Sequence, residues 1–271
     1  MSNMKHVERS GAGVLTGALA LTLSLVCTVT QASSMKEAQP RESTDMIAFS
    51  TSETLSVRQQ SIVPIAALAA SGDLTRLNVA LNQALDSGLT VSDAKEVLIQ
   101  LYAYAGFPRS LNALSELMRV VEERKRQGIN DAPGSSPSRA IPKGEELLVA
   151  GTANQTKLLG GPVAGPIFQF APTIDEYLKT HLFGDIFERD NLDWQTREVA
   201  TVSMLSVLPG AEPQLRAHMR ISMNVGLSEG QLRQVSEVLT QRVDADSGGR
   251  AMEALLQTLP AEKNSSASCT E

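Results

Sequence analysis

Proton transfer near neutral pH is the chemistry that this sequence offers most directly, through His218. The residue lies in the segment LRAHMRISM, on the same helical stripe as Leu215 and Met219. An imidazole titrates close to neutral pH, so His218 could serve as a general acid or base. The alternative is a core histidine whose ring is satisfied by a hydrogen bond.

A second group that could do chemistry is the adjacent pair Arg197 and Glu198. A guanidinium matches a carboxylate with two parallel hydrogen bonds, so Arg197 could bind the carboxylate of a substrate. Glu198 is a candidate for contact with the same substrate. The alternative for both residues is a salt bridge, buried within the chain or shared between subunits.

The segment EVLIQLYAYAGFP, residues 96–108, supplies a third set of candidates. Glu96 lies away from the apolar stripe of its helix, which fits an exposed glutamate. The next two turns are apolar nearly all round, however, so Glu96 could also be partly buried, with a raised pKa. Tyr102 and Tyr104 point in different directions, and each could pack in the core or face a pocket. Phe107 is expected to shape the turn and the substrate-binding surface.

Helices must position these residues, since helical signals recur along the chain and strand signals are scarce. Apolar residues repeat every three or four positions in 74–85 and again in 94–105. Gly88 stands where a left-handed residue ends a helix, and Thr90 with Asp93 forms a capping box for the next one. Pro108 fits the first turn of another helix. The predicted fold class is all-α.

The same order of signals returns in the second half of the chain. With an offset of 137 and then 138 residues, Gly88-Leu89 falls on Gly226-Leu227, which indicates a tandem duplication. The two repeats keep different candidates, because Ala80 stands opposite His218 and Gln234 opposite Glu96. We therefore expect one composite site per chain, in which Glu96, the tyrosines and the Gly-Phe-Pro turn face Arg197 and His218.

Three segments resemble the carboxymuconolactone decarboxylase family, which has the all-helical alkyl hydroperoxidase D-like fold. They are EVLIQLYAYAGFPRSLNAL, FGDIFERDNLDWQTREVAT and PQLRAHMRISMNVGLSEGQL. The resemblance implies duplicated domains of this fold, a homo-oligomer commonly built on threefold symmetry, and sites near helix ends and subunit contacts. The family pattern has a glutamate, an Arg-Glu pair and a histidine where this chain has Glu96, Arg197-Glu198 and His218.

The resemblance also implies a reaction, the loss of CO₂ from a carboxylated lactone, which needs no metal or organic cofactor. The predicted function is cofactor-free proton transfer or decarboxylation on a small carboxylated lactone or related organic acid, with His218, Glu96 and Arg197 as catalytic residues. The alternative is a non-catalytic binding or assembly module of the same fold.

Thiol-based peroxide reduction, found in the peroxidase branch of this fold, is disfavoured. That branch has a Cys-x-x-Cys motif beginning twelve residues after the glutamate, and a histidine four residues further on. Here those places hold Pro108, Leu111 and Ser115. Without a thiolate and a resolving cysteine, the peroxidase cycle cannot proceed.

Composition narrows the set of partners. The chain has a net charge of −6 and no cluster of cations, which argues against nucleic acid. Its three histidines lack a spacing that would supply three ligands, so no metal site is predicted.

The ends and the middle of the chain have their own composition. Residues 1–32 have a basic start and an apolar run, typical of a signal peptide cleaved near Ala32, with a retained membrane anchor as the alternative. Cleavage would give an exported protein, periplasmic or secreted, without stable membrane insertion. The remaining predicted parts are a disordered lead-in (33–54), a first repeat (55–126), a linker (127–146), a second repeat (147–259) and a flexible tail (260–271).

Overall fold

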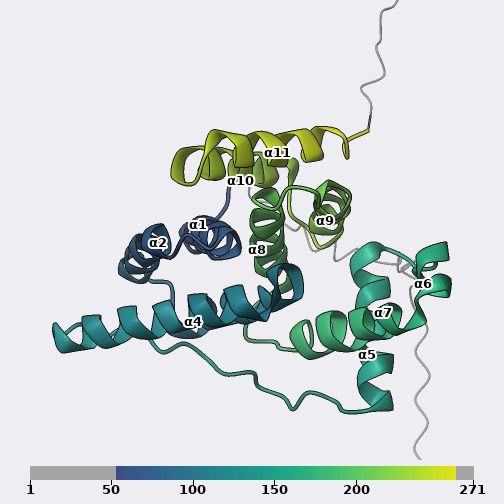
Figure 1. Ribbon diagram of the computed structural model, residues 1–271, viewed down its shortest axis with the longest axis horizontal. Helices are drawn as coiled ribbons and strands as arrows, with labels where there is room; N and C mark the ends of the chain where they lie inside the picture. The colour runs from purple at the N-terminus through teal and green to yellow at the C-terminus, as the bar shows by residue number, and fades with distance from the viewer. Residues whose placement is uncertain (1–52, 261–271) are drawn as a thin grey trace, which may run out of the picture. The chain divides into compact units, whose positions relative to one another are not determined.

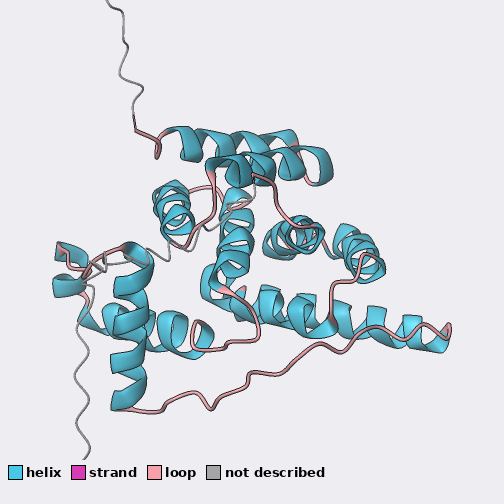
Figure 2. Ribbon diagram, turned by 180° about the vertical axis from the view of Figure 1, so that it is seen from behind, coloured by secondary structure: helices cyan, strands magenta, loops and turns pink. Residues whose placement is uncertain are grey.

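Every regular element in residues 53–260, the part that the computed structural model describes, is a helix (Figures 1 and 2). The all-α prediction is therefore confirmed. The predicted signal peptide and nearly all of the predicted lead-in and tail lie outside the described residues. Within the described part, no helix has both the length and the apolar character needed to cross a membrane.

The first repeat contains four helices whose ends follow the local sequence signals. Thr90 and Asp93 form both halves of a capping box, and Gly88 has a φ of 89°. Gly106 interrupts the last helix with φ 82° and ψ 161°, a left-handed conformation that favours glycine, and the helix resumes at Phe107 and Pro108. The four helices are α1 (Val57–Ser71), α2 (Leu74–Asp86), α3 (Val91–Gln100) and α4 (Tyr102–Arg126).

The second repeat has the same order of elements. Ser228 and Gln231 restate the capping box, and Gly226 has a φ of 97°. Its helices are α8 (Trp194–Ser206), α9 (Glu212–Asn224), α10 (Glu229–Arg242) and α11 (Ala245–Leu256). The helices of the two repeats match in sequence order, and α3 and α10 share a full capping box, in agreement with the predicted duplication.

A further helical segment lies between these two sets of four helices, mostly within residues 147–259, which were predicted as the second repeat. It contains α5 (Glu145–Leu159), α6 (Pro166–Phe170), α7 (Pro172–Tyr177) and the π-helix η1 (Leu178–Ile186). The stretch before α5 runs as a long irregular connection, visible in Figure 2, and is tied to the start of α3 by backbone hydrogen bonds from Val91 and Ser92. Gly134 in this stretch has a φ of 73°, and a Cβ there would lie 2.3 Å from Thr90 Oγ1.

The two repeats share one hydrophobic core. Helices α1 and α8 pack against each other, and α8 lies between α1 and α9 (Figure 1). A second apolar cluster joins α5, η1 and α9 and includes Leu158, Phe183, Phe187 and Ile221. Tyr102 and Tyr104 pack against this second cluster, so the segment between the repeats covers the start of α4.

Candidate functional site

Glu96 lies at the centre of a buried charge cluster that joins the two repeats. Its carboxylate, 3% exposed, accepts two hydrogen bonds from Arg189, at 2.8 Å from Nε and 2.7 Å from Nη2. Nη2 of Arg197 donates a third, at 3.1 Å. Glu96 belongs to α3 of the first repeat and Arg197 to α8 of the second, so the pairing is long-range.

Glu96 is buried, which rules out the exposed glutamate, and its pKa is lowered, whereas the alternative of a partly buried Glu96 predicted a raised value. Burial opposes ionisation of the carboxyl, but the interactions with Arg189, Asn191 and Arg197 outweigh it. The prediction was wrong because two arginines converge on this carboxylate. Glu96 is therefore ionised near neutral pH, and its oxygens are occupied by guanidinium donors.

Arg197 is fully buried, and both terminal nitrogens of its guanidinium donate within the protein, whereas its Nε has no hydrogen-bond partner among the described residues. Besides Glu96, it donates from Nη2 to the backbone oxygen of Arg189 at 2.9 Å and from Nη1 to Gln100 Oε1 at 3.3 Å. Desolvation lowers its pKa, and the pairing with Glu96 opposes that shift. This geometry does not support the expected direct contact between Arg197 and a substrate carboxylate. Arg189, whose side chain is 27% exposed, is the member of the cluster that reaches solvent.

His218 on α9 pairs with Glu198 on α8. The distance from His218 Nδ1 to Glu198 Oε2 is 2.8 Å, and the Glu198 side chain is fully buried. A carboxylate at Nδ1 favours the tautomer that carries the proton there, and leaves Nε2 as the basic nitrogen. His218 keeps 10% side-chain exposure, and its Nε2 has no hydrogen-bond partner in residues 53–260. Since Glu198 is enclosed, its position fits orientation of the imidazole rather than the predicted contact with substrate.

Tyr104 completes the group from the first repeat. Its ring stands edge-on to the imidazole of His218, with ring centroids 5.5 Å apart and an interplanar angle of 78°. Its hydroxyl is buried and makes no hydrogen bond of regular geometry among the described residues, although the side chain of Thr201 lies close enough to act on its pKa. Burial and the nearby negative charge of Glu198 raise the pKa of Tyr104. The phenol therefore stays protonated and can donate a hydrogen bond.

Tyr102 and Phe107 form a separate aromatic pair. Their rings are stacked, with centroids 4.6 Å apart and an interplanar angle of 7°. Phe107 is 62% exposed. The structure thus places Tyr104, rather than Tyr102 or Phe107, against the imidazole of His218. Residues from both repeats meet here, as the composite-site hypothesis requires, and the catalytic and binding roles remain predictions.

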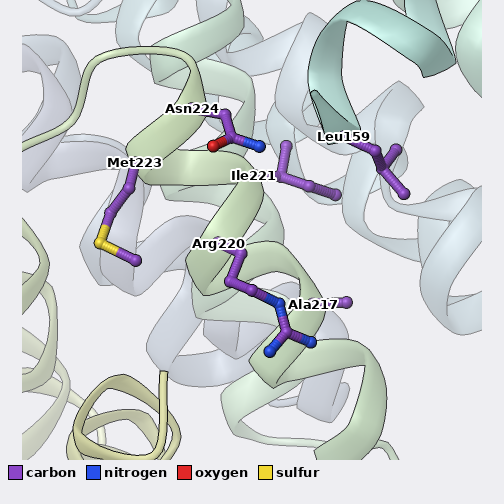
Figure 3. A pocket seen from close by; sticks show the side chains of 6 residues that line it. All are labelled: Leu159, Ala217, Arg220, Ile221, Met223 and Asn224. Carbon is purple, nitrogen blue, oxygen red and sulfur yellow. The ribbon is translucent and has the colours of Figure 1, made fainter. Parts of the chain in front are cut away.

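A cavity of about 370 Å³ lies beside the helix that carries His218. It is lined by Leu159, Ala217, Arg220, Ile221, Met223 and Asn224 (Figure 3). Leu159 belongs to α5, and the other five lining residues belong to α9. The cavity could not be predicted from the repeat pattern, because Leu159 belongs to the segment between the repeats.

Within residues 53–260, no cluster of three or more His, Cys, Asp or Glu side chains could hold a metal ion.

Two helical repeats that share one core, with an ion-paired glutamate and a Glu–His pair at their junction, define a duplicated helical protein. A sequence model of the carboxymuconolactone decarboxylase family matches residues 39–117 and 172–259, more than half of the chain. The protein belongs to this family. No curated protein matches the sequence.

Proposed function

We propose that the protein catalyses cofactor-free proton transfer or decarboxylation on a small carboxylated lactone or a related organic acid. The observation that carries this proposal is the 2.8 Å pairing of His218 Nδ1 with the buried Glu198, which leaves Nε2 unpartnered among the described residues. Membership of the carboxymuconolactone decarboxylase family supports the substrate class.

The roles follow from the positions of the side chains. His218 Nε2 takes a proton from the substrate, and Glu198 stabilises the imidazolium that forms. The ring of Tyr104 packs edge-on against the imidazole and holds it in position. In a decarboxylation, the C–C bond to the carboxylate breaks and CO₂ leaves. The electron pair passes to the conjugated carbonyl, and protonated His218 returns a proton to the carbon framework.

The charge cluster around Glu96 contributes in a different way. Arg189 and Arg197 share the single carboxylate of Glu96, and Arg189 is partly exposed. A positive charge that reaches solvent attracts an anionic substrate. We assign Arg197 a positioning role, since its guanidinium has no exposed surface.

A substrate screen tests the proposal. The purified protein and its His218→Ala variant are offered carboxylated lactones and oxo acids, and loss of substrate and release of CO₂ are measured. Turnover by the wild type that disappears in the variant supports the proposal. Turnover that is equal in both proteins contradicts the role of His218, and a screen without any turnover favours the second candidate.

The second candidate is a non-catalytic assembly module, favoured by an exposed apolar stripe on α4. Phe107, Leu111 and Met118 are 62%, 59% and 60% exposed and share one side of the helix. Contiguous exposed apolar surface marks a contact site. A homo-oligomer with threefold symmetry, formed through this stripe, is compatible with either candidate.

Oligomerisation through the stripe can be measured directly. Light scattering after size exclusion gives the mass of the wild type and of Leu111→Glu, with Glu237→Gln on an exposed part of α10 as a control. A multimeric wild type and control, with a smaller Leu111→Glu species, support the assembly. A monomeric wild type contradicts it.

Export is the remaining part of the proposal. Cleavage near Ala32 would deliver the helical part of the chain to the periplasm or the medium. The intact mass of the protein recovered from its native compartment distinguishes a cleaved chain from one that keeps residues 1–32.

A further inference from the structure

A cavity of about 270 Å³ is lined by α1 and α2 of the first repeat and by Arg242 of α10, at the place that corresponds to the Glu–His pair of the second repeat. Pro64 of α1, with Leu68 and Ala80, contributes buried apolar lining, and Arg76, Gln83 and Arg242 contribute polar lining. The cavity therefore combines an apolar interior with two guanidinium groups.

The duplication explains why space is left here. The offset of 138 residues relates Ala80 to His218 and Tyr104 to Arg242. At the Glu–His pair, the rings of Tyr104 and His218 meet, with centroids 5.5 Å apart. At the cavity, the methyl group of Ala80 and the flexible side chain of Arg242 occupy the equivalent positions, so the volume of both rings is missing.

The chemistry of this cavity differs from that of the Glu–His pair. Ser61 takes the position of Glu198, and its hydroxyl donates to the backbone oxygen of Val57 at 3.0 Å. With alanine in place of the histidine, the cavity has neither the imidazole base nor its carboxylate partner. It is equipped for binding rather than for proton transfer.

The charges of the lining residues select the ligand. Arg242 donates from Nη2 to Gln83 Oε1 at 2.5 Å and has no ion pair within residues 53–260. Arg76 pairs with Asp73 at 2.7 Å. It also donates to the backbone oxygen of Val243 at 2.7 Å, and Val243 is the residue that follows Arg242, so the two arginines lie near each other. Asp73 pairs with Arg76, and the charge of Arg76 also lowers the pKa of Asp244, whereas Arg242 has no carboxylate partner among the described residues. Arg242 can therefore take a carboxylate from a ligand.

We propose that the chain carries a second, non-catalytic site, formed by α1 and α2 together with Arg242 of α10, which binds a small monocarboxylate with a compact apolar body. The apolar body lies against Pro64, Leu68 and Ala80, and the carboxylate pairs with Arg242. The volume of the cavity is at the small end of the range for ligand pockets, which limits the ligand to about one ring. This site is independent of the proposed function at His218.

Benzoate is a suitable probe, with benzamide as its neutral counterpart. Titration calorimetry on the full chain is expected to show benzoate binding that Arg242→Gln weakens about tenfold or more, since a charge-assisted pair is lost. Ala80→Leu, which fills the cavity, is expected to remove binding. Arg126→Gln, at an exposed arginine of α4, and His218→Gln are expected to leave it unchanged.

Four results would overturn this inference. They are absence of benzoate binding to the wild type, equal affinity for benzamide, affinity that Arg242→Gln leaves unchanged, and loss of binding in His218→Gln. The last result would place benzoate at the Glu–His pair instead. Since Arg242 is exposed, its substitution tests the site even if Ala80→Leu fails to fold.

Discussion

Tyr104 of the first repeat and His218 of the second meet edge to face, with ring centroids 5.5 Å apart. Each repeat supplies one ring, and the equivalent positions in the other copy hold Ala80 and Arg242. Neither repeat contains the whole group by itself. The two repeats together therefore form this pair of rings.

Replacing Glu198 with glutamine tests its role as the partner of His218. The amide keeps the shape of the side chain but cannot stabilise an imidazolium by charge. Turnover on a substrate found in the screen is expected to fall about 100-fold, within the range for general acid–base catalysis. The measurement is kcat of Glu198→Gln beside Glu237→Gln, an exposed glutamate on α10. Unchanged kcat in Glu198→Gln would contradict the assigned role.

The buried ion pair makes a prediction about stability. In Glu96→Gln, Arg197 stays buried without a carboxylate, so the free energy of unfolding should fall by about 3–5 kcal/mol. Urea unfolding followed by circular dichroism measures this change. Arg197→Gln should cost less, because Glu96 keeps both hydrogen bonds from Arg189.

The positions equivalent to Glu96 and Arg197 in the opposite repeats suggest a double variant in which both members of the ion pair are replaced. Gln60 and Gln234 occupy the positions equivalent to Arg197 and Glu96, and both contact the backbone of Leu55, at 2.8 and 2.6 Å. The variant Glu96→Gln/Arg197→Gln copies this neutral pair, so it should unfold at higher urea than Glu96→Gln alone. Strictly additive losses would show that the two side chains are not coupled.

The pH dependence of stability follows from the lowered pKa of Glu96. The unfolded chain binds a proton near the ordinary value of 4.5, and the folded chain only at a lower pH. The stabilisation is therefore complete above that value and is lost as the pH falls toward the folded pKa. Urea unfolding at a series of pH values should show a smaller acid loss for Glu96→Gln than for the wild type. An identical acid slope for both proteins would contradict the prediction.

The break at Gly106 makes a backbone prediction. An alanine Cβ would lie 3.6 Å from Pro108 Cδ, an ordinary contact, so the cost comes from the φ of 82°. Gly106→Ala should lower the free energy of unfolding by about 1–2 kcal/mol. Gly161→Ala, where a Cβ would meet open space, serves as the control. Equal stability of the two variants would contradict this explanation of the helix break.

Local signals were sufficient to predict the helices of the first repeat, but not the division of residues 166–186 into α6, α7 and the π-helix η1. Thr90, Gly106 and Pro108 act on their nearest neighbours in the chain, so a capping box and a helix break can be predicted from sequence alone. The duplication was also visible, because caps and glycines recur in order. The family followed from the segments around Glu96, Arg197 and His218.

Interactions between distant residues were not predictable in the same way. The environment of Glu96 depends on Arg189, 93 residues away, and the helical pattern around Glu96 contains no sign of it. A hydrogen bond between two helices of each repeat was likewise not predictable, because the serine that donates it stands on different helices in the two repeats. Ser110 donates to Leu98 O at 2.7 Å, whereas in the second repeat Ser236 donates to Gly248 O at 2.8 Å. The helix-to-helix hydrogen bond is kept while the donor changes helix.

The most direct test of proton transfer by His218 compares two histidine variants on one substrate from the screen. His218→Gln removes the base, and His181→Gln removes a histidine that is 55% exposed and pairs with Asp185. We predict that kcat/KM falls about 100-fold or more in His218→Gln and is unchanged in His181→Gln, with both variants folded by circular dichroism. A His218→Gln protein that turns over as fast as His181→Gln would contradict the proposed role.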